Sequence, residues 1–339
     1  MYIERHAEKT VQKLSEMFGA VLVTGSRQVG KTTLLKEILG DINYVTLDDP
    51  LLRQNAASHS STFLKDFPPP VFIDEVQYAP QLFSYIKMIL DSSKKKGQFY
   101  LTGSQQFEMM KNVGESLAGR VGILKLLPLS LREISKSSFD LPFLPTEEYF
   151  AKREMKSTKH TYDEIWQIIH SGSMPETIVN KQYDWQMYWG AYVSTYIQRD
   201  VRQLTQVADE GKFTSFMTII ASRTSQLVNL ASIARDVGIS EPTAERWLSI
   251  LVTSGIVYLL KPYYNNVTSR MIKTPKLYFL DTGLAAYLTR WNNAEVLKNG
   301  AMSGAFFETF VVSEIIKSYY NNGVLELPLF FGVTRTPMR

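Results

Sequence analysis

A glycine-rich run near the start of the chain has the residue types and spacing of a phosphate-binding loop. It matches the pattern G-x-x-x-x-G-K-[ST] at every fixed position and consists of Gly25, Ser26, Arg27, Gln28, Val29, Gly30, Lys31 and Thr32, followed by Thr33. The two glycines let the backbone wrap tightly, so that successive N–H groups converge on an anion. A helix beginning at Lys31 would add the positive end of its dipole. We expect the Lys31 ammonium to bind the β- and γ-phosphates of a nucleotide, and the Thr32 hydroxyl to ligate Mg²⁺.

A second group of chemistry-bearing residues follows an apolar run at 71–73. Asp74 ends that run and Glu75 comes next. A carboxylate in this position lies at the carboxyl edge of a strand, where open α/β sheets bind their ligands. We therefore expect Asp74 to hold the metal, directly or through water, and Glu75 to act as the base that polarises an attacking water.

Two further positions extend the predicted site. Ser104 follows the next strand-like run, and we expect it to sense the γ-phosphate, with Gln105 as second choice; the alternative is a simple strand-end turn. Arg120 precedes the last such run, where a guanidinium finger would neutralise transition-state charge, an effect of ~10³–10⁵ in rate where it operates. The alternative for Arg120 is a structural ion pair with Glu115 or Glu133. If Arg120 acts in trans, the protein must form a homo-oligomer.

The elements that must position these residues are short apolar runs alternating with helical stretches. The runs occupy residues 20–24, 44–47, 71–73, 99–102 and 121–127. Nearly all-apolar strands spaced by helices predict a parallel sheet covered on both faces. We predict an α/β fold with a P-loop NTPase parallel sheet sandwiched by helices. A helical lid, a winged helix-turn-helix and a partial α/β C-terminal domain follow.

The later part of the chain is read mainly from helical periodicity. Residues 131–210 are mostly helical, and the aromatic stripe that starts at Trp185 is typical of core packing. Residues 230–237 and 242–254, joined by a glycine-containing turn and followed by an apolar strand at 256–260, outline a winged helix-turn-helix. The second of these helices carries only Glu241, Glu245 and Arg246 as charges, which favours a spacer between domains over reading of the DNA major groove.

Composition excludes several classes of protein. The chain has 339 residues, of which 45% are apolar and 21% charged, as in globular proteins of two or three domains. It has no cysteine, which excludes disulfides, cysteine zinc sites and thiol nucleophiles and fits a reducing, cytoplasmic location. No apolar run approaches 18 residues, so we expect no membrane span. The net charge of +4 is too small to predict a nucleic-acid binder by itself.

Taken together, the motifs resemble a family of prokaryotic AAA-type ATP-binding proteins with a C-terminal restriction-endonuclease-like domain of unknown function. The matching segments are residues 25–34, 71–77, 101–105, 116–121, 196–201, 275–284 and 304–308. The resemblance implies a P-loop AAA-type ATPase domain at 1–130, a helical lid at 131–210, a winged-helix-like module at 211–264 and the nuclease-like domain at 265–339. It also makes Arg199 a candidate second sensor of the γ-phosphate, the alternative being a structural ion pair.

The sequence departs from this family at two kinds of position. Ser26 and Ser173 stand where the family has proline and glycine, and neither change removes a phosphate ligand. The tail after 331 contains no acidic residue, and after Glu308 only Glu314 and Glu326 remain. A metal-dependent nuclease centre needs several converging carboxylates. We therefore expect a truncated C-terminal domain without a working nuclease centre.

These observations predict an ATP-binding protein that uses Mg²⁺ to hydrolyse ATP and couples hydrolysis to switching of a partner or nucleic-acid assembly. The alternative is a nucleotide-gated binding module with negligible hydrolysis, acting through DNA or a protein partner. A nuclease regulated by the ATPase would need the acidic centre that the sequence lacks. The sequence identifies neither the partner nor the oligomeric state.

Overall fold

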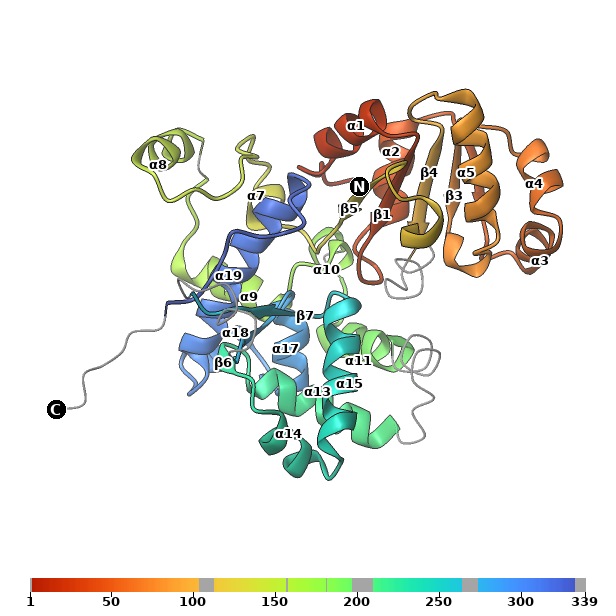
Figure 1. Cartoon of the computed structure of the whole chain (residues 1–339). Coiled ribbons are helices and arrows are strands. Elements are labelled where there is room, and N and C mark those ends of the chain that lie inside the picture. The colour runs from red at the N-terminus through yellow and green to blue at the C-terminus, as the bar shows by residue number, and fades with distance from the viewer. Residues whose placement is uncertain are drawn as a thin grey trace. The chain divides into compact units, whose positions relative to one another are not determined.

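The chain divides into two compact units, whose helices and strands are labelled in Figure 1. The computed structural model describes residues 2–103, 113–156, 158–180, 182–196, 210–263 and 274–332. The first unit contains Met1–Ser157 together with Lys317–Leu325, and the second contains Thr158–Ile316 together with Glu326–Arg339. The long helix α19 (Ser303–Asn321) therefore starts in the second unit and contributes its last turn to the first.

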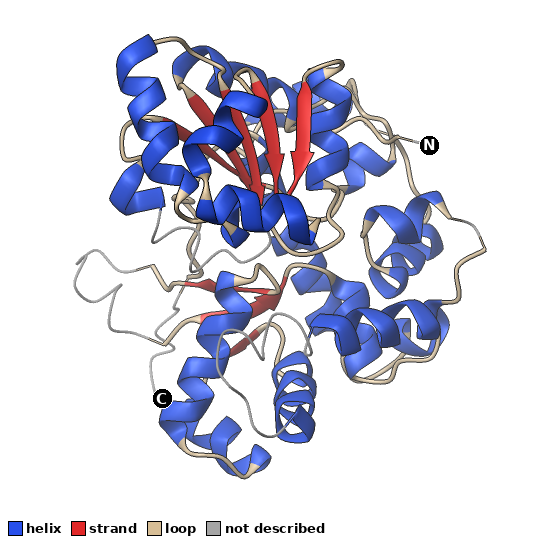
Figure 2. Cartoon of the chain, turned by 90° about the vertical axis from the view of Figure 1, so that its right-hand side faces the viewer, coloured by secondary structure: helices blue, strands red, loops and turns tan. Residues whose placement is uncertain are grey.

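A parallel sheet forms the centre of the first unit, with strand order β2-β3-β4-β1-β5. Its strands are β1 (Ala20–Thr24), β2 (Asn43–Thr46), β3 (Val71–Asp74), β4 (Phe99–Gly103) and β5 (Val121–Lys125). They lie at the runs expected from the sequence, although β5 ends at Lys125 rather than at residue 127. Figure 2 shows these strands side by side with helices packed across them. All residues of β1, β3 and β4 are buried, which explains why their sequences are almost continuously apolar.

Helices flank this sheet and close its core. They are α1 (Glu8–Met17), α2 (Lys31–Leu39), α3 (Pro50–Ser58), α4 (Ser60–Asp66), the 3-10 turn η1 (Val76–Tyr78) and α5 (Leu82–Ser93). The first unit also contains α7 (Leu131–Ile134) and α8 (Glu147–Glu154), which follow the last strand in the chain. Phe63 of α4 and Phe83 of α5 are fully buried in one apolar cluster with Leu22, Ile73 and Phe99 of the strands. Burying this apolar surface drives the helices onto the sheet and fixes the edge at which the strands end.

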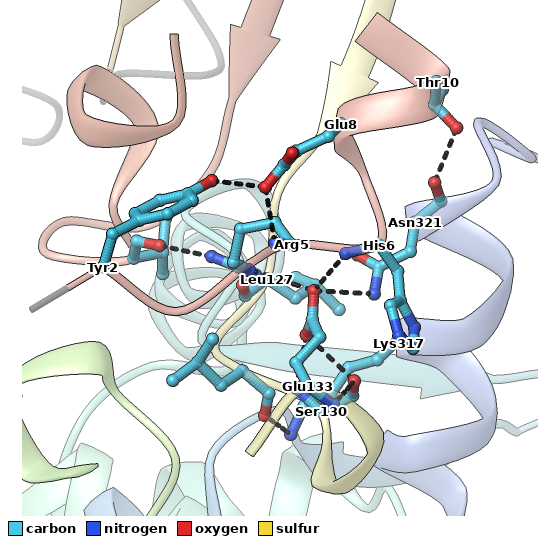
Figure 3. A network of polar contacts seen from close by, with 12 residues as sticks. Tyr2, Arg5, His6, Glu8, Thr10, Leu127, Ser130, Glu133, Lys317 and Asn321 are labelled. Atoms are coloured by element: carbon cyan, nitrogen blue, oxygen red, sulfur yellow. Dashed lines mark hydrogen bonds and ion pairs between the residues drawn. The ribbon is translucent and has the colours of Figure 1, made fainter. Parts of the chain in front are cut away.

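A buried ion pair connects the start of the chain to α7 (Figure 3). Arg5 and Glu133 are almost completely buried, and their side chains lie 3.0 Å apart. Burial alone would raise the pKa of Glu133. The Arg5 charge and the backbone N–H of Ser130 outweigh that effect and lower the pKa from 4.5 to about 2. The carboxylate therefore stays ionised inside the folded unit.

The second unit is mostly helical and carries a small antiparallel sheet of order β6-β8-β7. Its strands are β6 (Gln226–Leu227), β7 (Val257–Leu260) and β8 (Lys276–Phe279). Its helices, besides most of α19, are α9 (Tyr162–Ser171), α10 (Pro175–Val179), α11 (Trp185–Tyr196), α13 (Glu210–Ser222), α14 (Leu230–Val237), α15 (Glu241–Thr253), α17 (Thr282–Leu288) and α18 (Ala294–Lys298). The aromatic stripe of α11 is core, as expected, because Trp189, Tyr192 and Tyr196 are buried.

Two helices at the positions expected from the sequence, α14 and α15, are joined by a short turn. Helix α14 ends at Gly238, which adopts the left-handed conformation with φ 73°, and Ser240 caps the start of α15 through the N–H of Thr243. Strand β7 follows, and it pairs with β8. Strand β6 pairs with the other side of β8, which completes the small sheet beside these two helices.

A buried carboxylate, Asp281, organises the middle of the second unit. Its Oδ1 accepts from the backbone N–H groups of Gly283 and Leu284 at the start of α17, at 2.8 and 3.3 Å. Its Oδ2 accepts from the N–H and hydroxyl of Ser173, at 2.9 and 3.2 Å. Asp281 thus caps one helix and ties it to the segment after α9.

We expect Asp281→Ala to destabilise the second unit by about 2–4 kcal/mol, because buried N–H groups lose a charged acceptor. The matched control is Asp236→Ala, which removes a carboxylate paired with Arg223 at a more exposed position in the same unit. That change should alter stability by less than about 1 kcal/mol. Urea unfolding of both variants measures the difference, and equal losses would contradict the role given to Asp281.

We expect the stability gap between wild type and Glu133→Gln to be largest near neutral pH. The pKa of Glu133 is lowered on folding, so its stabilisation is complete above about pH 5 and is lost as the pH falls from 4.5 towards 2. The free energy of unfolding of both proteins, measured between pH 7 and pH 3, tests this. A gap that stays constant over that range would show that the pair does not stabilise the unit as an ion pair.

Candidate functional site

The glycine-rich run forms the turn between β1 and α2, as the sequence predicts. Gly25 directly follows β1 and lies against Leu126, the residue that directly follows the neighbouring strand β5. A Cβ atom at Gly25 would lie 2.2 Å from the carbonyl oxygen of Leu126. Gln28 and Gly30 have positive φ angles, of 62° and 90°, and Gly30 is the N-cap of α2. Only a residue without a side chain fits at Gly25, and the left-handed turn brings the chain round to the start of α2. The first-turn amides of this helix therefore open onto the loop.

The side chain of Lys31, the first residue of α2, reaches back across the loop to its first two residues. This side chain is buried, and its ammonium donates to the carbonyl oxygens of Gly25 and Ser26 at 3.1 and 2.9 Å. The Ser26 hydroxyl is also buried, and it has no hydrogen-bond partner among the described residues. A buried ammonium and a buried hydroxyl at one turn are suited to bind the oxygens of an anion.

Asp74 lies at the end of β3, beside the start of α2. Its two carboxylate oxygens accept from the Thr32 hydroxyl at 3.1 and 3.0 Å. The Thr102 hydroxyl of β4 donates to the same carboxylate, and the hydroxyl of Tyr44 on β2 lies 3.3 Å from it. The sequence predicted the pairing of Thr32 with Asp74 at one site, and the structure brings these two residues together.

Thr102 and Tyr44 are site residues that the sequence analysis missed. Both reach Asp74 because parallel pairing places β2 and β4 on either side of β3, with Thr46 opposite Asp74 and Leu101 opposite Ile73. Burial and the nearby Asp74 charge raise the pKa of the Tyr44 hydroxyl, which keeps it a donor. Strand order and register were needed to find them, and neither can be read from a motif.

Glu75 follows Asp74 in an unusual backbone conformation. Its φ of 57° is left-handed, which is uncommon outside glycine and is found at functional sites. Its backbone N–H donates to the Thr102 hydroxyl at 3.3 Å, and the Gln77 side-chain amide donates to its carboxylate. The proposed base is therefore held at the same strand edge as Asp74, next to the carboxyl end of β4.

Arg120 takes a different ion-pair partner from either of those expected. It binds Asp91 of α5 through two nitrogens, at 2.5 and 3.1 Å, and not Glu115 or Glu133. The reason is that Glu133 is buried against Arg5, whereas Asp91 lies at the end of α5, beside the turn that leads into β5. The pair is solvent-exposed, so it contributes little to stability. Ser104, Gln105 and Arg199 lie outside the described residues.

The residues present fit a nucleotide with Mg²⁺. Mg²⁺ in such sites takes one or two protein oxygens together with phosphate oxygens and water. The Thr32 hydroxyl and the Asp74 carboxylate supply oxygens of this kind, side by side and next to the amides of α2. Within the described ranges, no three His, Asp or Glu side chains gather as a self-sufficient metal site. In the same ranges, none of the helices combines the length and apolarity needed to span a bilayer.

The part of the chain that contains the site matches a known domain family. Residues 18–135 match a family described as an AAA domain, and this range contains the loop, Asp74 and Glu75. Residues 162–295 match a domain of unknown function, DUF8612. The winged-helix and nuclease-like interpretations of the later segments stay predictions.

Similar proteins extend the match over most of the chain. Uncharacterised proteins of Mycobacterium bovis and Mycobacterium tuberculosis are each 26% identical over 327 residues, which is 93% of this chain and 66% of the relative. The chain thus spans just under two thirds of the length of these relatives. A Walker-type ATPase of Pyrococcus abyssi has a similar fold, with a TM-score of 0.53, 16% identity, and 85% of this chain and 96% of that chain covered. At that identity the likeness shows the fold alone.

We expect Gly25→Ala to weaken nucleotide binding at least tenfold and to destabilise the first unit by about 1–3 kcal/mol, because the added Cβ overlaps the Leu126 carbonyl. Gly114→Ala is the control, since a Cβ at that position meets nothing within 4 Å. Calorimetric titration with ADP and thermal unfolding of both variants measure the two effects. If both variants bind ADP as wild type does, the loop does not have the role assigned to it.

Proposed function

We propose that this chain binds ATP with Mg²⁺ and hydrolyses it to ADP and phosphate. One observation carries the proposal: the Thr32 hydroxyl and the Asp74 carboxylate meet within 3.1 Å, directly beside the glycine-rich turn that starts α2. The turn supplies anion-binding amides, and the pair supplies metal-binding oxygens. The AAA domain match over residues 18–135 supports the same interpretation.

Binding would use the loop and the first turn of α2. In this proposal the backbone N–H groups of residues 25–33 hold the phosphate oxygens, and the Lys31 ammonium moves from the Gly25 and Ser26 carbonyls onto the β- and γ-phosphates. Charge-assisted hydrogen bonds of this kind are about twice as strong as neutral ones. The buried Ser26 hydroxyl offers one more donor at the same turn.

Hydrolysis would use the acidic end of β3. When bound, Mg²⁺ would neutralise charge on the phosphate oxygens, with Thr32 and Asp74 as its protein ligands. Glu75 would accept a proton from the water that attacks the γ-phosphate. The Thr102 hydroxyl donates to the Asp74 carboxylate and accepts from the Glu75 backbone N–H, so it orients Asp74 and holds the Glu75 backbone beside it. Thr102 and Tyr44 would then hold Asp74 in place rather than touch the nucleotide.

Three further residues complete the proposed site. Ser104 would sense the γ-phosphate, Arg120 would stabilise transition-state charge, and Arg199 would act as a second sensor from the helical lid. For Arg120 this requires release from Asp91, and the exposure of that pair makes the release inexpensive in free energy. Action of Arg120 in trans would make the active form a homo-oligomer.

Hydrolysis is proposed to switch the second unit and, through it, a DNA or protein partner. The helix-turn-helix of α14 and α15 is the element that supports such a partner. Helix α15 carries Glu241 and Glu245 against Arg246, a charge balance that suits a protein contact better than the DNA major groove. We propose four parts of the chain: an ATPase domain at 1–130, a helical lid at 131–210, a winged-helix-like module at 211–264 and a C-terminal domain at 265–339.

One observation favours the alternative of a nucleotide-gated module with negligible hydrolysis. The Gln77 amide donates to the Glu75 carboxylate, so the proposed base already has a hydrogen-bond partner. This hydrogen bond occupies part of the carboxylate that would otherwise accept from an attacking water. Turnover measurements separate the two functions.

We expect Glu75→Gln to keep ATP binding within about threefold of wild type and to lower the rate of phosphate release by about 10²–10⁴. We expect Lys31→Ala to lose binding instead, because an ammonium is removed from the phosphate site. Phosphate release and calorimetric titration with ATP and Mg²⁺ give the two quantities separately.

Lys65→Ala is the control for these variants, since Lys65 is an exposed residue of α4 in the same unit. It should behave as wild type in both measurements. Wild-type turnover no faster than that of Glu75→Gln, with binding intact, would favour the gated module. Equal ATP affinity of wild type and Lys31→Ala would overturn both functions.

A further inference from the structure

Arg5 donates three hydrogen bonds that join distant parts of the first unit (Figure 3). Its Nε donates to Glu133 Oε1 at 3.0 Å, Nη1 to the carbonyl oxygen of Val29 at 2.9 Å, and Nη2 to the carbonyl oxygen of Leu127 at 2.7 Å. Val29 belongs to the glycine-rich loop, and Leu127 follows β5. Arg5 is 4% exposed, so these contacts form away from water. None of the roles assigned above uses Arg5.

The contact with Val29 fixes the direction of a loop amide. A trans peptide is planar, so its C=O and N–H groups point in opposite directions. Holding the Val29 carbonyl towards Arg5 therefore turns the N–H of Gly30 to the opposite side of the loop. Gly30, with its φ of 90°, has no side chain to restrict this peptide, and an outside contact is needed to restrict it.

The contact with Leu127 holds the segment after β5, which packs against the first residue of the loop, Gly25. The N–H of Leu126 donates to the carbonyl of Thr24 at 2.7 Å, and the Leu126 carbonyl is the atom that excludes a side chain at Gly25. The Arg5 guanidinium thus holds the Val29 peptide near the end of the loop, and it also holds the segment at Leu127, beside the start of the loop. Only arginine offers donors in this fixed, forked arrangement.

Glu133 holds the guanidinium in turn. Besides Arg5, its carboxylate accepts from the backbone N–H groups of His6 and Ser130, at 2.9 and 2.7 Å. The side-chain amide of Asn321 also donates to it, at 3.3 Å. A buried guanidinium without its carboxylate would be strongly destabilising, so the two charges act as one structural element.

Asn321 ends α19, and two more bonds anchor that last turn in the first unit. The Lys317 ammonium donates to the Leu129 carbonyl at 2.9 Å, and the Thr10 hydroxyl donates to the Asn321 carbonyl at 2.7 Å. Lys317 is 2% exposed. The rest of α19 belongs to the second unit, so the Arg5–Glu133 pair contacts both the loop and the helix shared by the two units.

We propose that Arg5 is a positioning residue for the phosphate-binding loop, and that Glu133 and Asn321 make this positioning depend on the last turn of α19. The proposal rests on the proposed function, because it assigns Arg5 a part in nucleotide binding. Arg5 does not touch the nucleotide; it directs the Gly30 amide that does. Anchoring of the α19 end and tightness of nucleotide binding are then linked.

The test compares ADP affinity with folding stability. Arg5→Lys keeps the positive charge beside Glu133 but cannot reach both carbonyls, so we expect the Kd for ADP to rise about tenfold or more at a temperature where the variant is folded. Asn321→Leu removes only one donor to Glu133, and we expect about a threefold rise. Kd is measured by calorimetric titration, and folding by thermal unfolding with and without saturating ADP.

Ser60→Ala is the matched control. It removes a buried hydroxyl that donates to the Ala56 carbonyl at 2.6 Å in the same unit, away from the loop, and it should lower stability without changing the Kd for ADP. Folded Arg5→Lys that binds ADP within twofold of wild type overturns the proposal. If Arg5→Lys does not fold, an unchanged Kd for Asn321→Leu overturns it. If wild type binds neither ADP nor ATP, the proposed function fails first, which is a different result.

Discussion

The site depends on keeping the backbone amides of one short loop directed to the same side. A peptide group cannot turn its N–H without turning its C=O, so each amide that faces an anion needs a partner for its carbonyl on the other side. In this chain the Arg5 side chain is such a partner for the Val29 carbonyl. Lys31 donates to the carbonyls of Gly25 and Ser26, and the proposed binding mode exchanges these two bonds for the phosphates. The bond from Arg5 is therefore the one that can hold the loop when an anion is bound.

The sheet supplies the second requirement, which is proximity. Because β1, β3 and β4 are parallel, their carboxyl ends lie at the same edge of the sheet. The last residues of these strands, and the residues that follow them, meet at this edge. Asp74 is bonded from α2 by Thr32 and from β4 by Thr102, so its carboxylate is fixed before any ligand arrives. Preorganised groups of this kind bind charge without having to rearrange at the moment of binding.

Local patterns predicted the loop, the helix from Lys31, the strands and the pair Asp74 and Glu75, because each depends on residues close in sequence. The helices α14 and α15 were predicted for the same reason. Thr102 and Tyr44 were missed because their contacts depend on strand order. The network of Arg5, Glu133 and Asn321 was missed because its members are far apart in the chain. Arg5 and Glu133 are separated by 128 residues, and Glu133 and Asn321 by 188. The partner of Arg120 was wrong because burial of Glu133 against Arg5 cannot be read from spacing.

The central claim is that the affinity for nucleotide resides in the phosphates and not in the base. Calorimetric titration of the wild-type chain with ATP, ADP, AMP and adenosine, in the presence of Mg²⁺, tests this most directly. The account predicts tight binding of ATP and ADP, and loss of at least a hundredfold in affinity for AMP and adenosine. Equal affinity for all four compounds, or binding of none of them, would contradict it.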